Sequence, residues 1–335
     1  MDTATTLECL PIDVYTHFNL EITDLIHLST INKYIRNMLL TSAIKVNSVT
    51  TYSSNMKTWV RFLLNVKFTN ENLNDIHLFA NVFTLDLSYT NVVDVSVLGS
   101  VHNLDLSCTK VRDVSALGRV HTLNITYTKV VDASALGGVH SLNLSRTKVV
   151  DVSALGSVHN LDLSYTNVRD VSALGRVHTL NITYTKVVDV SALGRVHNLD
   201  LSRTNIVDVS ALGGVHSLNL SFTKVVDVSH LGRVHNLGLS YTSVIDVSCL
   251  GGVYSLNLTS TAVVDVSMLG EVHTLNLSGT KVIDVSALGR VYTLYLRDTK
   301  NLDVSSLRGI HNLNLSRTNV VDVSKSIENR NIIFS

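Results

Sequence analysis

The stretch from residue 101 to residue 119 reads VHNLDLSCTKVRDVSALGR, and it is one copy of a 19-residue repeat. One leucine marks the repeat most clearly, because it recurs thirteen times without insertion or deletion from Leu85 to Leu313. Self-similarity at a fixed period of about this length is typical of repeat architectures. The period therefore predicts a solenoid, in which each repeat is stabilised by packing against its two neighbours.

Within each repeat, the sequence predicts one short strand and one tight turn. In residues 120–126 (VHTLNIT), apolar Leu123 and Ile125 alternate with polar residues, which is the pattern of a strand with one buried face. Residues 113–118 (DVSALG) offer an aspartate to cap a single helical turn, two apolar residues to bury and a glycine to end the turn. We expect one parallel strand in every repeat and a short return segment behind it.

The repeat resembles the leucine-rich repeat, whose LxxLxLxxNxL core it matches at Val101, Leu104, Leu106, Thr109 and Val111. The resemblance implies an α/β repeat fold: a right-handed solenoid with a parallel β-sheet and a short 3₁₀ or extended back. Threonine stands in every repeat where the family usually has asparagine. We expect its hydroxyl to form a ladder that bonds the loop backbone.

The composition describes a core-forming protein without charge bias, with 27 basic and 27 acidic residues and 45% hydrophobic residues. Nucleic acid and anionic membranes are bound through basic faces, so neither is an expected partner. The three cysteines lie far apart, which excludes a disulfide framework as a fold determinant. The sequence contains neither a signal-like start nor eighteen consecutive apolar residues, so we expect a cytoplasmic protein.

The N-terminal part, residues 7 to 40, shares none of the 19-residue period. Helical spacing and capping residues predict three short helices, the first opening at Leu10-Pro11 and the second capped by Thr23-Asp24. The expected domains are a helical segment (1–45), a helical linker or N-terminal cap (46–65) and a solenoid with degenerate end caps (66–335).

The N-terminal helical segment resembles an F-box, through Leu-Pro-x-Asp-Val at 10–14, Asp-Leu at 24–25 and Ile-Asn-Lys at 31–33. It departs from the family in having a short stretch between Phe18 and Leu25, and in lacking a frequent tryptophan. The resemblance implies a substrate adaptor that docks on a Skp-type subunit of a cullin-RING ubiquitin ligase while the repeats hold a protein substrate. The residues implied to face the adaptor are Leu10, Pro11, Val14, Leu25 and Ile31.

F-box segments joined to simple tandem repeats are also abundant in large DNA viruses of amoebae, and the DVSALG-rich array is similar to theirs. A viral origin would place the protein in the host cell cytoplasm. The alternative interpretation is that the N-terminal segment merely caps the solenoid. The chain would then be a leucine-rich-repeat scaffold that binds proteins and has no ubiquitin role.

The eighth position of the repeat varies most, and it carries mainly tyrosine and arginine. These residue types are enriched at protein-binding hot spots. The partner-binding residues predicted from this position are Tyr89, Tyr127, Arg146, Tyr165, Tyr184, Arg203, Phe222, Tyr241 and Arg317. The alternative is an aromatic ladder that only stabilises adjacent repeats. The family's ligand-facing strand positions are small and polar, such as Thr122, Asn124 and Thr126.

Two further repeating features have structural interpretations. The second position carries a histidine in ten repeats: His102, His121, His140, His159, His178, His197, His216, His235, His273 and His311. A metal site needs three or four ligands in one place, so a uniform file favours stacked structural imidazoles. Each DVS aspartate is expected to cap its turn. With neither a nucleophile paired to a base nor a phosphate-binding glycine loop in the sequence, we expect no enzyme, cofactor or metal.

Overall fold

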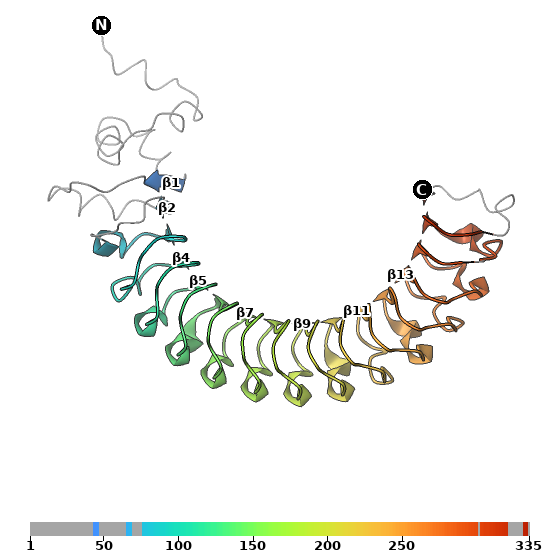
Figure 1. Ribbon diagram of the computed structural model, residues 1–335, viewed down its shortest axis with the longest axis horizontal. Coiled ribbons are helices and arrows are strands. Elements are labelled where there is room, and N and C mark those ends of the chain that lie inside the picture. The colour runs from blue at the N-terminus through green and yellow to red at the C-terminus, as the bar shows by residue number, and fades with distance from the viewer. Residues whose placement is uncertain (1–42, 47–64, 69–75, 301, 321–330, 334–335) are drawn as a thin grey trace, which may run out of the picture. The chain divides into compact units, whose positions relative to one another are not determined.

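The computed structural model describes residues 43–46, 65–68, 76–300, 302–320 and 331–333 (Figure 1). The chain divides into two compact units, residues 1–149 and 150–335. The three predicted N-terminal helices fall within residues 1–42 and lie outside the described residues. So do all five residues implied to face a Skp-type adaptor: Leu10, Pro11, Val14, Leu25 and Ile31.

The described part of the first compact unit contains six parallel strands that pair in sequence order. The strands are β1 (Ala43–Val46), β2 (Asn65–Phe68), β3 (Thr84–Asp86), β4 (Asn103–Asp105), β5 (Thr122–Asn124) and β6 (Ser141–Asn143). Short 3₁₀ turns connect some of them: η2 (Ile76–Phe79), η3 (Ser115–Leu117) and η4 (Ser134–Gly138). One strand in each repeat, backed by 3₁₀ turns, confirms the predicted repeat fold from β3 onward.

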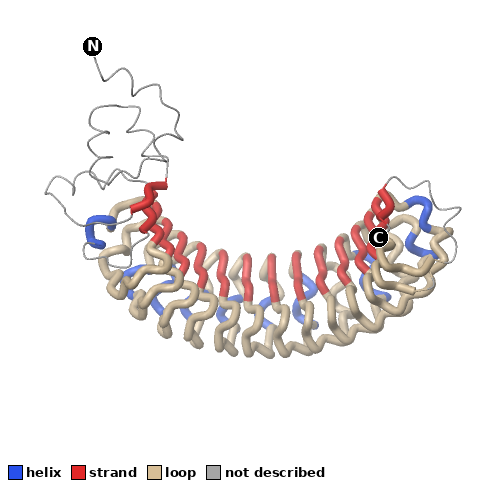
Figure 2. The backbone as a smooth tube through the Cα atoms, turned by 45° about the horizontal axis from the view of Figure 1, so that its top comes forward, coloured by secondary structure: helices blue, strands red, loops and turns tan. Residues whose placement is uncertain are grey.

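The second compact unit repeats this arrangement. Its strands are β7 (Asn160–Asp162), β8 (Thr179–Asn181), β9 (Asn198–Asp200), β10 (Ser217–Asn219), β11 (Asn236–Gly238), β12 (Ser255–Asn257), β13 (Thr274–Asn276), β14 (Thr293–Tyr295), β15 (Asn312–Asn314) and β16 (Asn331–Ile333). Its 3₁₀ turns are η5 (Ser153–Leu155), η6 (Ser172–Leu174), η7 (Ser191–Leu193), η8 (Ser210–Gly214), η9 (Ser248–Gly252), η10 (Ser286–Leu288) and η11 (Leu307–Gly309). The strands lie along one side of the compact unit and the turns along the opposite side (Figure 2).

Equivalent residues of neighbouring repeats pair across the sheet, as Leu199 does with Leu218. Strand β1 is the exception, because Ile44 pairs with Val66 and the chain makes a longer excursion between them than the period predicts. Residues 43–46 are therefore extended and not helical. Most of the helical linker predicted for residues 46–65 lies outside the described residues. We call one repeat of the solenoid a rung. The β1 rung could not be predicted from the sequence because its spacing to the next rung differs from 19 residues.

The core consists of six apolar side chains per repeat, contributed by the strand, the loop that follows it and the 3₁₀ turn. In one repeat these side chains are Val196, Leu199, Leu201, Ile206, Val209 and Leu212, each at most 3% exposed. The inward residues of neighbouring repeats stack on them, so burial is completed only by the next rung. This packing leaves the side chains that follow each strand at the surface, where the candidate site lies.

Candidate functional site

Each described strand from β3 to β15 runs into a turn that side-chain oxygens help to hold. At the end of β9, Asp200 Oδ1 accepts a hydrogen bond from the Ser202 amide at 2.9 Å. The hydroxyl of Thr204, which is buried, donates to the Leu201 carbonyl at 2.5 Å. The predicted threonine bond to the loop backbone is therefore confirmed. In the rungs from β3 to β14 it closes the turn within its own repeat, whereas Thr318 donates to the Leu296 carbonyl of the preceding repeat.

The residue at the eighth position of the repeat lies in this turn with a left-handed backbone. Twelve such residues other than glycine have φ between 56° and 60°, and Gly279 has φ 68°. The left-handed region is unfavourable for residues with a Cβ, and hydrogen bonds to the next rung hold the backbone there, as from the Arg203 amide to the Ser221 carbonyl at 3.0 Å. The sequence did not predict this left-handed conformation, because the residue type at the eighth position varies between repeats. Gly279 is the one residue there whose type favours a positive φ.

Because every turn has the same conformation, the eighth-position side chains lie one above another in the second compact unit. Tyr165 stacks on Tyr184 with ring centroids 4.5 Å apart, and Phe222 stacks on Tyr241 at 4.4 Å. Between the two pairs, Arg203 Cζ lies 5.1 Å from the centroid of the Tyr184 ring and 4.0 Å from that of Phe222. We call these five residues the aromatic–arginine ladder. The four rings are 41–53% exposed.

The other predicted eighth-position residues are placed less uniformly. In the first compact unit, Arg146 Cζ lies 4.9 Å from the Tyr127 ring centroid. Tyr89 hydrogen-bonds Cys108, and this bond is the main cause of the raised pKa of its phenol. Arg317 lies one rung from Asp298, outside the aromatic–arginine ladder. The eighth-position side chains therefore stack as in the predicted stabilising ladder, and their rings remain partly exposed. Binding of a partner by these residues stays a prediction.

The polar strand positions hydrogen-bond one another across the rungs. Asn124 Nδ2 donates to Asp105 Oδ2 at 3.1 Å, and the Thr126 hydroxyl donates to Asn124 Oδ1 at 2.7 Å. In the second compact unit, such side chains line a shallow groove of about 490 Å³ over β8 to β12. Much of the hydrogen-bonding capacity expected to face a ligand is therefore used within the sheet.

The histidines stack as the sequence predicts. Within each compact unit, consecutive rings lie 4.5–4.7 Å apart and nearly parallel, and Tyr254 and Tyr292 continue the stack. Lone pairs of imidazole lie in the ring plane, so parallel stacked rings do not converge on one ion. Among the described residues, no group of three or more potential ligands surrounds a common point.

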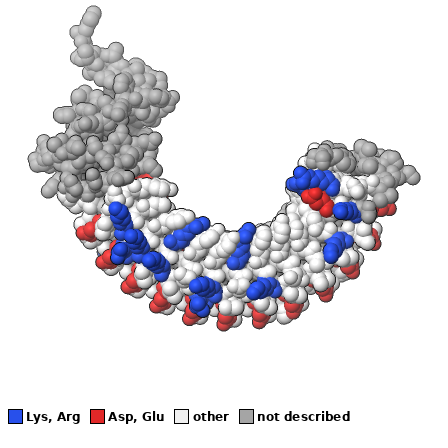
Figure 3. Space-filling model, in the orientation of Figure 1, with Lys and Arg blue, Asp and Glu red and all other residues white. Residues whose placement is uncertain are grey.

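The DVS aspartates hold the start of their turns, but from one residue before the N-cap, which is a valine such as Val190. Asp189 Oδ1 accepts a hydrogen bond from the Ser191 amide at 2.9 Å, and the same bond recurs in other repeats. This bond is the main reason that the pKa of Asp189 lies below its ordinary value. In both compact units a row of acidic side chains lines the edge away from the strands (Figure 3).

The stacked histidines predict a loss of stability in mild acid. Partial burial lowers the pKa of His121 and of His197, and the charges of the adjacent histidines lower it further. The unfolded chain, with histidine pKa values near about 6.5, then binds more protons than the folded chain. Stability should hold above that pH and fall as pH drops below it. We expect a lower midpoint of chemical denaturation at pH 5.5 than at pH 7.5.

Tyrosine provides the matched control, since Tyr254 already stacks between two histidines. His121→Tyr with His197→Tyr should keep the stack and reduce the difference between the two midpoints. The aspartates do not contribute in this range, because their lowered pKa values place their loss of stability below about pH 4. A midpoint that is unchanged or higher at pH 5.5 contradicts the prediction.

Comparison with solved structures identifies the fold as the leucine-rich-repeat solenoid. An internalin from Listeria monocytogenes superposes with a TM-score of 0.64 and 19% identity, covering 84% of this chain and 95% of that one. A leucine-rich-repeat protein from Leptospira interrogans gives 0.71 and 17%, covering 90% and 92%. The plant peptide hormone receptor RGFR1, in complex with RGF2, gives 0.54 and 16%, covering 76% and 53%.

Sequence comparison adds no relative, because no protein-family model matches the chain and no curated protein sequence does. Among the described residues, no helix is long and apolar enough to cross a membrane.

Proposed function

We propose that this chain is a leucine-rich-repeat scaffold that binds a protein partner through the aromatic–arginine ladder. The observation that carries the proposal is a row of stacked but exposed tyrosine, arginine and phenylalanine side chains on one edge of the sheet. Stacking holds each ring in place, so little conformational entropy is lost when a partner covers it. The receptor RGFR1, whose fold is similar, was solved with a bound peptide hormone, RGF2.

The experiment compares two triple variants in affinity capture from amoebal cytosol, followed by mass spectrometry. Tyr184→Ala, Arg203→Ala and Phe222→Ala together should remove partners that the wild type captures. Alanine keeps the left-handed backbone and its cost, so only the stacking is lost, at about 0.5–1.5 kcal/mol per contact. The matched control, Val188→Ala, Val207→Ala and Val226→Ala, truncates another exposed row of the same three rungs and should retain capture.

Melting temperatures separate binding from stability. We expect the ladder variant to melt somewhat below the wild type and to remain folded at the capture temperature. If capture is lost only because the variant unfolds, the ladder is purely stabilising. If the folded ladder variant captures the same proteins as the wild type, the proposed site is wrong.

The N-terminal segment supports a more specific role. We propose that it is an F-box-like segment that docks on a Skp-type adaptor of a cullin-RING ubiquitin ligase, so that the solenoid presents a protein substrate for ubiquitination. The support is the order of the motifs at 10–14, 24–25 and 31–33. In this role the protein acts in the cytoplasm, which is the host cytoplasm for a viral protein. It is not itself an enzyme and uses no cofactor, nucleic acid or membrane.

A further inference from the structure

Strand β14 and the turn after it break a rule that other rungs obey. In eleven of the thirteen rungs from β3 to β15, an asparagine or aspartate at the fifth position accepts a hydrogen bond from the amide two positions later. Gly238 on β11 and Tyr295 on β14 take the place of that acceptor in the remaining two. The β14 rung also replaces the usual serine or threonine of the seventh position with Arg297.

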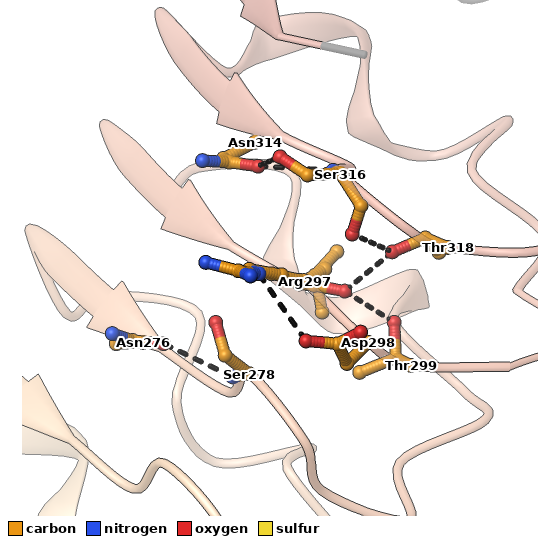
Figure 4. Close-up of polar contacts among 9 residues, drawn as sticks. Asn276, Ser278, Arg297, Asp298, Thr299, Asn314, Ser316 and Thr318 are labelled. Atoms are coloured by element: carbon orange, nitrogen blue, oxygen red, sulfur yellow. Dashed lines mark hydrogen bonds and ion pairs between the residues drawn. The ribbon is translucent and has the colours of Figure 1, made fainter. Parts of the chain in front are cut away.

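This departure is not a gradual loss of the repeat towards its end. The preceding rung has Asn276 Oδ1 accepting from the Ser278 amide at 3.0 Å. The following rung has Asn314 Oδ1 accepting from both the Ser316 amide and its hydroxyl. Figure 4 shows both regular turns on either side of Arg297. Tyr295 and Arg297 therefore interrupt an otherwise regular polar face, and Tyr295 removes the acceptor of the turn hydrogen bond. Residues that break a structural rule in this way are typical of functional positions.

The two side chains are accessible and lie in a basic neighbourhood. Tyr295 is exposed, unlike the half-buried residues at the ends of the other described strands from β3 to β15. Arg297 Nε lies 3.2 Å from Asp298 Oδ2, and both side chains are half exposed (Figure 4). The same turn adds Lys300, and the two neighbouring turns add Lys281 and Arg317. Lysine and arginine side chains surround an acidic patch near this end of the second compact unit (Figure 3).

The row of eighth-position side chains is also open beside Arg297. That position holds the small Ser260 and then Gly279, so the bulky row that ends at Tyr241 does not continue towards Arg297. Gly279 itself contributes no side chain to this row. The eighth position next to Arg297 therefore carries no bulky side chain.

We propose that Tyr295 and Arg297 bind an anionic group, a carboxylate or a phosphate, on a peptide segment of the protein partner. The guanidinium matches the geometry of two acceptor oxygens, and the phenol supplies a further donor next to it. Asp298 orients the guanidinium through its Nε, which leaves the terminal nitrogens to the ligand. The proposal that the anion is part of a protein depends on the proposed scaffold function. The anion site itself is inferred from the β14 rung alone.

The test uses variants that return the rung to the sequence of its neighbours. Tyr295→Asn and Arg297→Ser introduce residues found at the same positions of the adjacent repeats, so the double variant should fold and melt at the same temperature or higher. The probes are three labelled peptides of identical acidic sequence with phosphoserine, glutamate or alanine at the centre, measured by fluorescence anisotropy. Inorganic phosphate serves as the competitor.

We expect the phosphoserine or glutamate peptide to bind the wild type at least tenfold more tightly than the alanine peptide. Each single variant should weaken that binding at least tenfold, and inorganic phosphate should displace it. Arg290→Ser, which removes an exposed arginine paired with Glu271 in the same part of the chain, is the control and should bind as the wild type does.

The outcomes are distinct. Equal binding of all three peptides, or unchanged binding by the folded double variant, overturns the site. A double variant that melts higher without any change in binding shows that Tyr295 and Arg297 are only irregularities of the repeat. The aromatic–arginine ladder variant is measured with the same peptides and should bind them as the wild type does. Loss of peptide binding in the Tyr295 and Arg297 variants therefore tests the anion site, whereas the capture experiment with the ladder variant tests the scaffold proposal.

Discussion

Replacing Gly194 with alanine is expected to lower the free energy of unfolding by about 3 kcal/mol, the upper part of the range for overpacking. A Cβ at this position would lie 2.2 Å from the carbonyl oxygen of Ala211 in the next repeat. The obstacle is backbone, so the two rungs would have to move apart. The φ of Gly194 is −62°, which any residue adopts, and at such a position alanine would ordinarily stabilise by about 0.4–1 kcal/mol.

Chemical denaturation of Gly194→Ala and Gly238→Ala provides the measurement and its control. A Cβ at Gly238 would lie 3.0 Å from Oδ1 of Asn219, a side-chain atom that can shift by a few tenths of an ångström and still accept its hydrogen bond from the Ser221 amide. This variant should therefore be neutral or slightly stabilising, since glycine within a strand is unfavourable. If Gly194→Ala is as stable as the wild type, the close approach of adjacent rungs at this point is wrong.

Replacing Leu10, Pro11 and Val14 together with alanine is expected to abolish capture of a Skp-type adaptor and its cullin. Apolar anchors of this kind contribute roughly 1–3 kcal/mol each when buried at an interface. Losing three of them corresponds to a change of two or more orders of magnitude in affinity. The measurement is affinity capture with the full chain, followed by detection of adaptor and cullin.

Two comparisons make this result interpretable. The aromatic–arginine ladder variant should still capture the adaptor, because its substitutions lie far along the chain in the second compact unit. Thermal unfolding of the triple variant is measured alongside, and a melting temperature equal to that of the wild type assigns the lost capture to the interface and not to unfolding. If the wild-type chain captures neither adaptor nor cullin, the F-box-like role is rejected and the protein-binding scaffold stands alone.

The 19-residue period was sufficient to predict the strands, the 3₁₀ turns and the six core positions of the regular repeats. It failed at β1, where Ile44 pairs with Val66 and the spacing to β2 exceeds the period. The histidine stack was predictable for the same reason as the strands, because equal spacing in a parallel sheet brings equivalent side chains together. A ladder of stacked eighth-position side chains was one of two interpretations of the sequence, and the common turn conformation showed that these side chains do stack.

The sequence by itself determined which residues are buried, since alternation and a constant period leave a single register for each rung. Tertiary structure alone decided the left-handed backbone of the eighth position and the close approach at Gly194. It also showed that Tyr295 replaces a side chain that elsewhere accepts a hydrogen bond. The physical reason is that these properties depend on atoms of the neighbouring rung. A carbonyl, an amide or a ring of the adjacent repeat sets the conformation of a residue, and the type of that residue does not indicate the conformation.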